Sequence, residues 1–171
     1  MDRIFRSFLF FALVVAGVYV AVVGGFTNNI SAAVDNKYNY NMTIFSKIIA
    51  GQIPSYKIAE NEMFFAFLDI APLREGHTLV VPKIETDKFF DMPGDYLASI
   101  LLFAKPIAHA IEKTFDCNRC GLTVIGLEVP HAHLHLIPID SVHDMDFKKN
   151  KLKFSPEEFK TTQQKILSAL K

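Results

Sequence analysis

Three histidines occupy every second position of the segment His131-Ala132-His133-Leu134-His135, and no other stretch of the sequence points so directly to chemistry. Side chains two residues apart on a β-strand lie on the same face, so a strand here would present the three imidazoles together. Ala132, Leu134 and Leu136 would lie on the opposite face, as in an ordinary strand packed on a core. A buried imidazole without partners costs free energy, so three on one face indicate a functional site.

Aligned imidazoles could perform two kinds of chemistry. Histidines with this spacing on a strand can bind one zinc ion. Alternatively, one imidazole could attack phosphorus while its neighbours orient it and supply protons. Imidazole suits this second role because its usual pKa of about 6.5 lets it change charge near neutral pH. A purely structural role remains a third possibility, and it is less favoured for three histidines than for one.

The composition limits the other classes of function. The chain has 171 residues, which is enough for one domain with a sizeable core. Lys and Arg together number 18, as do Asp and Glu, and no block of like charge stands out. A clustered basic surface is therefore absent from the sequence, which argues against nucleic acid as a partner. The two cysteines, Cys117 and Cys120, do not form a disulfide framework and favour a structural role over a zinc or redox site.

Hydrophobic patterning predicts the elements that position the histidines. Strands are expected at residues 56–60, 63–68, 77–81, 121–126 and 131–139, and their short connections favour an antiparallel sheet. A short helix is expected at 44–50, and Gly51 and Pro54 would end it. Apolar residues at three- and four-residue spacing predict a long helix over 93–115, kinked or divided at Pro106. A last helix is expected to begin at Ser155-Pro156. These elements predict an α+β fold.

Residues 1–42 differ in composition from the domain assigned to residues 43–171. Residues 8–26 carry no charge and are hydrophobic all round, which suits a membrane anchor or a signal peptide. Residues 28–41 are polar and rich in asparagine, as in a linker. Met42 stands directly before the globular pattern, so a translation start at Met42 is a third interpretation. All three interpretations stay open at this point.

Several motifs together resemble one family. His131-Ala-His-Leu-His-Leu-Ile resembles the His-x-His-x-His-x-x signature, with x apolar, of the histidine triad (HIT) nucleotide-binding proteins. Residues 43–54 resemble that family's opening helix, residues 65–72 its second strand and residues 76–83 its third. The resemblance covers essentially residues 43–139. It implies a HIT-like fold, with a five-stranded antiparallel sheet, a long helix and a C-terminal helix, usually assembled as a homodimer.

The resemblance also implies a role for each site residue. His133 would be the nucleophile and form a covalent nucleotidyl-imidazole that water hydrolyses. His131 and His135 would orient it and bind the phosphate, and His77, the family's fourth histidine, would support His131. Asp69 would accept hydrogen bonds from the ribose hydroxyls. The purine base would lie among five apolar residues: Phe45, Ile48, Ile53, Phe67 and Ile70.

We therefore expect a nucleotide phosphoramidase or dinucleoside polyphosphate hydrolase that acts at the α-phosphorus of a purine nucleotide conjugate without a cofactor. His135 favours a hydrolase over the related transferases, which typically carry Gln there. Ser46 stands where some members have a zinc-binding cysteine, so no metal is expected. Two alternatives remain: a metal-dependent hydrolase that uses the histidine cluster, and a non-catalytic nucleotide-binding regulatory protein.

The sequence departs from the family pattern just before the triad. Leu127-Glu128-Val129-Pro130 is short where the family commonly has a longer Gly-rich loop with polar donors. Glu128 also introduces an acid, and a carboxylate beside a phosphate repels it. The asparagine common near the end of the preceding strand is replaced, since Val124 and Ile125 stand there. These departures bear on the substrate and the rate.

The location of the enzyme follows from its expected substrate. Arg3 and Arg6 precede the apolar run, so a single membrane span would place the domain outside the cell by the positive-inside rule. Nucleotides are scarce there, so we expect a cytoplasmic enzyme, associated with a membrane only if residues 8–26 are retained as an anchor. Recovery of the full-length chain in the carbonate-resistant membrane fraction of its native cells would contradict this expectation.

Overall fold

Five strands form one antiparallel sheet in the computed structural model, which describes residues 42–171. The strands are β1 (Lys57–Glu60), β2 (Phe64–Leu68), β3 (Thr78–Pro82), β4 (Arg119–Thr123) and β5 (Leu134–Ile139). They lie in the order β1-β2-β3-β5-β4, so the last strand of the sequence is inserted between β3 and β4. The predicted α+β fold with a five-stranded antiparallel sheet is confirmed.

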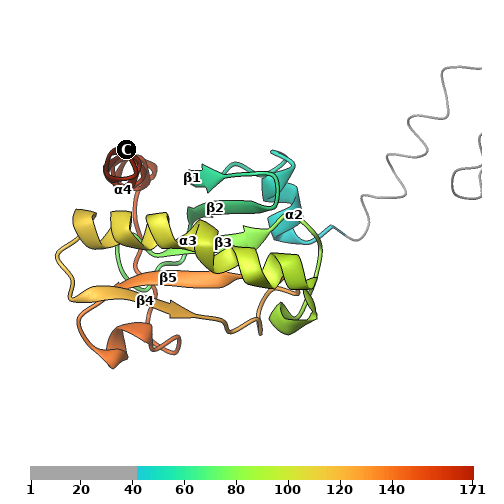
Figure 1. Cartoon of the computed structure of the whole chain (residues 1–171). Helices are drawn as coiled ribbons and strands as arrows, with labels where there is room; N and C mark the ends of the chain where they lie inside the picture. Colours follow the sequence, from blue (N-terminus) through green and yellow to red (C-terminus); the bar gives the residue numbers. More distant parts are fainter. Residues whose placement is uncertain (1–41) are drawn as a thin grey trace, which may run out of the picture. The chain divides into compact units, whose positions relative to one another are not determined.

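Three α-helices accompany the sheet in the described part of the chain: α2 (Ile44–Ile49), α3 (Gly94–Thr114) and α4 (Pro156–Ala169). Two 3-10 helices, η1 (Phe89–Asp91) and η2 (Val142–Met145), lie in the connections. α3 runs across one face of the sheet (Figure 1). It continues through Pro106, so of the two alternatives left open at this residue the structure has one helix and not two shorter ones. Ser155 caps α4 as predicted, by accepting a hydrogen bond from the backbone N–H of Glu158.

The two faces of the sheet bury different groups. The larger core lies between the sheet and helices α3 and α4, and includes Ile107, Ile111 and Ile166 with Leu134 and Leu136. A smaller aromatic cluster lies under α2 on the other face and consists of Phe45, Phe65, Phe67, Leu79 and Val81. This cluster shares its face with the third histidine of the triad, because His135 pairs with Leu79 across the strands. The alternation expected along the histidine stretch, with leucines on the core side, is therefore confirmed.

The ends of two strands differ from the prediction. The strand expected at 121–126 is β4, which begins two residues earlier, at Arg119. β5 begins only at Leu134, so His131 and His133 lie in the segment leading into it. The neighbouring strand β3 ends at Pro82, which has no backbone N–H to extend the ladder. Ala132 instead donates its N–H to the carbonyl oxygen of Thr86, at 2.6 Å.

Residues 42–171 contain no helix long and apolar enough to cross a membrane. The interpretations of residues 8–26 as an anchor or a signal peptide concern a stretch outside the described residues. The same holds for the linker at 28–41.

Candidate active site

One ring nitrogen of His133, Nδ1, is held by a hydrogen bond to the backbone, and this bond leaves the other nitrogen, Nε2, free. Nδ1 of His133 lies 2.6 Å from the backbone carbonyl oxygen of His131. A carbonyl oxygen can only accept, so Nδ1 carries the proton and, in the neutral ring, Nε2 carries a lone pair. The Phe45 ring packs edge-on against the imidazole, with the ring centroids 5.2 Å apart. His133 is therefore oriented by the backbone of His131 and presents the lone pair of Nε2.

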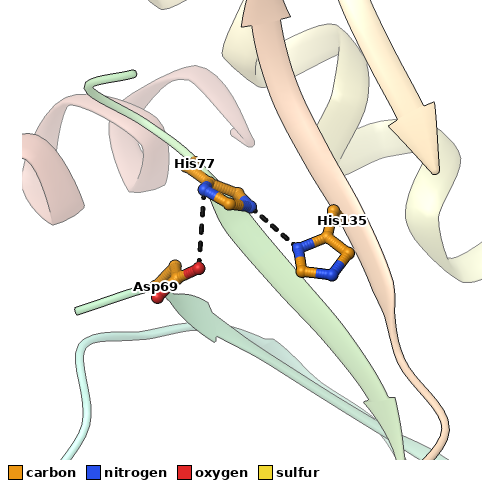
Figure 2. A group of neighbouring side chains, drawn as sticks. All are labelled: Asp69, His77 and His135. Atoms are coloured by element: carbon orange, nitrogen blue, oxygen red, sulfur yellow. Dashed lines mark hydrogen bonds and ion pairs between the residues drawn. The ribbon is translucent and has the colours of Figure 1, made fainter. Parts of the chain in front are cut away.

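The third histidine of the triad is paired with the fourth, as Figure 2 shows. Nε2 of His77 lies 3.0 Å from Nδ1 of His135. Leu73 donates its backbone N–H to Nδ1 of His77 at 3.2 Å, so the proton of the neutral His77 ring is on Nε2. That proton is donated to Nδ1 of His135, which leaves the His135 proton on Nε2. The expectation that His77 supports His131 is wrong, because the β3–β5 register places His77 beside His135 instead.

Both paired imidazoles are neutral at physiological pH. Burial, with the positive charge of Lys151 as a smaller contribution, lowers the pKa of His77 to about 3. Burial and the adjacent His77 lower the pKa of His135 to about 3. Each ring thus keeps a single proton, which agrees with the chain of donors from Leu73 through His77 to His135.

His131 is held at both ring nitrogens and has no exposed surface. Nε2 lies 2.9 Å from the carbonyl oxygen of Pro82, and Nδ1 lies 2.8 Å from Oγ1 of Thr43. Burial lowers the pKa of the imidazole. The structure therefore places His131 beneath the site, where it supports the segment that carries His133.

Asp69 lies beside the histidine pair at the end of β2 (Figure 2). Its Oδ1 accepts the backbone N–H of Ala71 at 2.8 Å, which is the arrangement of a loop-capping aspartate. Its Oδ2 lies 3.5 Å from Nδ1 of His77. The side chain is partly exposed, at 19%. Asp69 thus both shapes the loop and presents an oxygen at the edge of the site.

The apolar residues expected around a base are only partly together. The rings of Phe45 and Phe67 pack edge-on with centroids 5.6 Å apart, and Ile48 packs against the same cluster. Ile53 is half-buried, and Ile70 is 72% exposed. The structure therefore supplies an aromatic floor next to the triad and an exposed isoleucine beside Asp69.

Two contacting residues were not predicted from the sequence. The Phe147 ring lies edge-on to His135, with centroids 4.8 Å apart. Nζ of Lys151 lies 4.8 Å from the centre of the Phe147 ring and donates to the Phe147 carbonyl oxygen at 3.1 Å. The one sequence feature that pointed to this contact is Phe147, an aromatic residue in the otherwise polar stretch after β5. The segment places an apolar cover and a positive charge next to the paired histidines.

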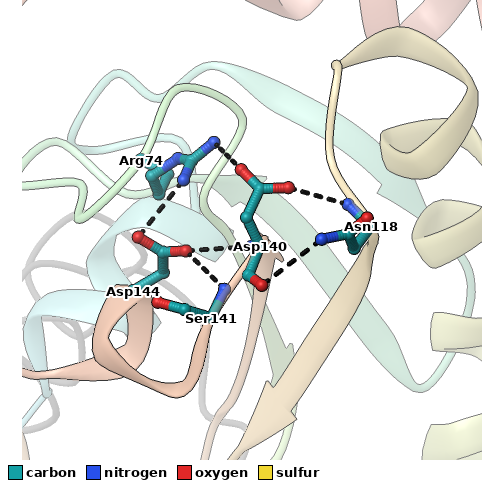
Figure 3. A network of polar contacts seen from close by, with 5 residues as sticks. All are labelled: Arg74, Asn118, Asp140, Ser141 and Asp144. Carbon is teal, nitrogen blue, oxygen red and sulfur yellow. Dashed lines mark hydrogen bonds and ion pairs between the residues drawn. The ribbon is translucent and has the colours of Figure 1, made fainter.

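A polar network joins the loop before His77 to the end of β5 (Figure 3). Arg74 forms ion pairs with Asp140 at 3.0 Å and with Asp144 at 3.2 Å. Asp140 also accepts the backbone N–H of Asn118 at 2.9 Å, and Asp144 accepts that of Ser141 at 3.0 Å. These contacts fix the loop that carries His77 to the strand that carries His135.

One group of side chains in the described part of the chain could hold a metal ion. Ligand atoms of Asp69, His77 and His135 lie within 4.8 Å of one another. A metal bound to both imidazoles would have to replace the hydrogen bond between them. The cysteines lie elsewhere as free thiols, and burial raises the pKa of Cys120 to about 12, which disfavours the thiolate form that binds metals. The donor set thus suits hydrogen bonding better than coordination.

Comparison with known proteins settles the family. The HIT domain model matches residues 50–142, which include all four buried histidines. The chain belongs to the HIT domain family. An uncharacterized HIT-like protein of Borreliella burgdorferi is 36% identical to this HIT protein over 131 residues, which are 72% of this chain and 94% of that protein.

Two further relatives extend the comparison. The adenosine 5'-monophosphoramidase of Schizosaccharomyces pombe is 34% identical over 130 residues, which are 75% of this chain and 98% of that enzyme. The crystal structure of a HIT-like protein involved in cell-cycle regulation from Bartonella henselae superposes with a TM-score of 0.66 at 30% identity, covering 75% of this chain and 96% of that one. The resemblance inferred from the sequence and the HIT fold are therefore confirmed.

Proposed function

We propose that this HIT protein binds purine nucleotides and hydrolyses a bond at the α-phosphorus of a nucleotide conjugate, either a phosphoramidate or a dinucleoside polyphosphate. The observation that carries the proposal is the hydrogen bond from Nδ1 of His133 to the His131 carbonyl, which leaves Nε2 as the nucleophile. The similarity to an adenosine 5'-monophosphoramidase favours the phosphoramidate. The expected catalytic set is His133 with His131, His135 and His77.

The reaction would proceed in two displacements. Nε2 of His133 attacks the α-phosphorus, the bond from phosphorus to the leaving group breaks, and an amine leaving group departs after taking up a proton from solvent. Water then attacks the nucleotidyl-imidazole, which releases the nucleoside monophosphate and restores the histidine. Nε2–H of His135, fixed by His77, would donate to a non-bridging oxygen as negative charge grows on it. A neutral donor suffices for this role.

The nucleoside would bind on the α2 side of the triad. The base would lie among Phe45, Ile48, Ile53, Phe67 and Ile70, of which Phe45 and Phe67 are buried and Ile70 is exposed. Asp69 would accept hydrogen bonds from the ribose hydroxyls through Oδ2, since its Oδ1 is engaged by Ala71. Glu128 is exposed in the short segment before the triad, so its charge can remain in solvent away from the phosphate.

Metal removal tests the mechanism. The protein, dialysed against excess chelator, is mixed with adenosine phosphoramidate, and the reaction is quenched early for intact-mass spectrometry. We expect undiminished hydrolysis and a mass increase corresponding to one adenylyl group, because the nucleophile is an imidazole and no step needs a metal. Loss of activity that returns on adding zinc would favour a metal-dependent hydrolase. Nucleotide binding without turnover would favour a regulatory protein.

We further propose that the protein forms a homodimer through one apolar surface. β4 is an edge strand, and α3 packs beside it. Large apolar side chains are exposed on both elements and on the segment after β4: Leu101, Leu102, Leu122, Val124, Ile125 and Leu127. An exposed edge strand with such side chains is a typical site for pairing with a second copy.

Light scattering on the chromatographed protein tests the assembly. We expect twice the mass of one chain at micromolar concentration for the wild type. The double substitution Leu122→Glu and Val124→Glu is expected to yield monomers, because like charges would oppose each other in the buried interface. Val142→Glu is the matched control, since Val142 is 82% exposed in η2 and outside this surface. A monomeric wild type would contradict the proposal.

A further inference from the structure

A chain of polar groups runs from Glu85 to the first histidine of the triad. Oε1 of Glu85 accepts the backbone N–H of Thr43 at 2.9 Å and also the hydroxyl of Ser46. Oγ1 of Thr43 lies 2.8 Å from Nδ1 of His131. The residues come from three parts of the sequence: the start of α2, the connection after β3 and the segment leading into β5. None of the roles assigned above uses Thr43, Ser46 or Glu85.

The positions of the protons in this series of hydrogen bonds follow from the groups at its two ends, Glu85 and the Pro82 carbonyl. Nε2 of His131 lies 2.9 Å from the Pro82 carbonyl oxygen, which can only accept, so Nε2 carries a proton. In the neutral ring Nδ1 is therefore an acceptor, and the Thr43 hydroxyl must donate to it. Oγ1 of Thr43 accepts in turn from the backbone N–H of Ser46 at 3.1 Å. The Pro82 carbonyl thus selects the Nε2–H tautomer of His131, and the Thr43 hydroxyl stabilises it by donating to Nδ1.

The same groups can also accommodate a protonated His131. Oγ of Ser46 lies 3.0 Å from Oγ1 of Thr43. If Nδ1 gains a proton, it donates to Thr43, whose hydroxyl then rotates to donate to Ser46, while the Ser46 proton stays on Glu85. Every group keeps a partner in both states. The hydrogen bonds from Ser46 and Thr43 lower the pKa of Glu85, so a negative charge stands at the far end of the chain.

The proposed nucleophile, His133, is coupled to this series of hydrogen bonds through the backbone of His131. The carbonyl oxygen of His131 accepts the Nδ1 proton of His133 at 2.6 Å, so the direction of that carbonyl sets the direction of Nε2 of His133. Because His131 is buried and held at both ring nitrogens, a change at Thr43 would reach His133 without any contact between the two.

We propose that Thr43, Ser46 and Glu85 form a hydroxyl relay that stabilises the His131 tautomer set by Pro82, balances the charge of His131 and thereby positions His133. The inference rests on the proposed function for its catalytic consequence, whereas the tautomer of His131 can be measured without turnover. Thr43, Ser46 and Glu85 are positioning residues, because each of them acts through His131.

A purely structural role must be separated from the relay. Thr43 is also the N-cap of α2, and losing a cap destabilises a protein whatever its site does. Ser155→Ala is the matched control, because Ser155 caps α4 through the same kind of bond far along the chain. Glu85→Gln leaves the cap intact and removes only the charge, and Asp87→Asn is its control at a neighbouring exposed position.

The experiment uses the full chain labelled with ¹⁵N-histidine. Long-range ¹H–¹⁵N spectra across about pH 5 to 9 report the tautomer and titration of each imidazole. We expect the Nε2–H form of His131 in the wild type and in Thr43→Ser. In Thr43→Val we expect a shift of the His131 Nδ1 signal, because Nδ1 loses the hydrogen bond from the Thr43 hydroxyl. Glu85→Gln should lower the pH at which His131 gains a proton, and Asp87→Asn should not.

Steady-state hydrolysis of adenosine phosphoramidate completes the test. Thr43→Val is expected to lower kcat about ten- to a hundredfold, the effect of leaving one buried acceptor unpaired, with KM little changed. Thr43→Ser should restore the rate to within about twofold, and Ser155→Ala should lower stability alone. The Nδ1–H form of His131 in the wild type, or an unchanged kcat in Thr43→Val, would overturn the relay. A wild type that shows the expected tautomer without hydrolysis would overturn the proposed function and leave the relay supported.

Discussion

Replacing His133 with alanine is expected to lower kcat/KM for adenosine phosphoramidate by about 10⁴-fold or more, which corresponds to at least about 5.5 kcal/mol of transition-state stabilisation. The substitution removes the proposed nucleophile, so the reaction would depend on direct attack by water. Binding of adenosine monophosphate should persist, because Phe45, Phe67 and Asp69 are unchanged. Stopped assays with a fluorescent phosphoramidate and titration calorimetry measure the two quantities.

The control for this substitution is His143→Ala, whose imidazole is exposed in η2. It should retain full activity. The His133→Ala protein should also keep its circular dichroism spectrum, since the losses are local: the edge contacts with Phe45 and His135 and one hydrogen bond to the His131 carbonyl. Residual activity within about tenfold of the wild type would remove His133 from the role of nucleophile.

Gly76→Ala is expected to lower the free energy of unfolding by about 3 kcal/mol. Gly76 has a φ of +90°, a region that side chains rarely adopt, and an added Cβ would lie 2.8 Å from Cδ2 and Cζ of Phe115. Backbone strain at residue 76 and overlap of the added Cβ with the Phe115 ring therefore act together. Relieving the overlap requires a movement of either the end of α3 or the loop that carries His77. Urea denaturation followed by circular dichroism gives the change.

Gly51→Ala separates the two causes. Gly51 has a similar φ of +74°, but nothing lies within 4 Å of an added Cβ. This variant should lose only about 1 kcal/mol, the strain contribution alone. It should also keep the activity of the wild type, whereas Gly76→Ala should lose activity because His77 follows directly. Equal losses of stability in the two variants would show that Phe115 moves aside without cost.

The sequence predicts the local features of the fold well, because they depend on neighbouring residues. The end of the first helix before Gly51 is one example, since Gly51 follows the C-cap residue Ala50 and has a φ of +74°. The start of α4 is another. The boundary of β5 was not predictable in the same way, because the strand begins where its partner β3 permits and not where the histidine alternation begins.

In the candidate site, too, the features that depend on neighbouring residues were predictable and those that depend on tertiary contacts were not. The alternating histidines were evident, and the resemblance to a family singled out His77 and Asp69. The partner of His77 was not evident, because it depends on the register between β3 and β5. Glu85 and Lys151 lie in polar connections with no periodicity, and only the folded chain brings Glu85 to Thr43 or Lys151 to Phe147. Tertiary contacts of this kind leave no signature in a single sequence.

The place of β5 in the sheet has a consequence for synthesis of the protein. The ribosome delivers β1, β2 and β3 first, and these can pair as a meander while the free edge of β3 still awaits its partner. That edge carries Leu79, Val80 and Val81, so the nascent chain displays an apolar strand until residue 139 has emerged. The strand that carries His135 is thus also the one that covers the apolar edge of β3, and a chain truncated before β5 would leave that edge free to pair with other chains and aggregate.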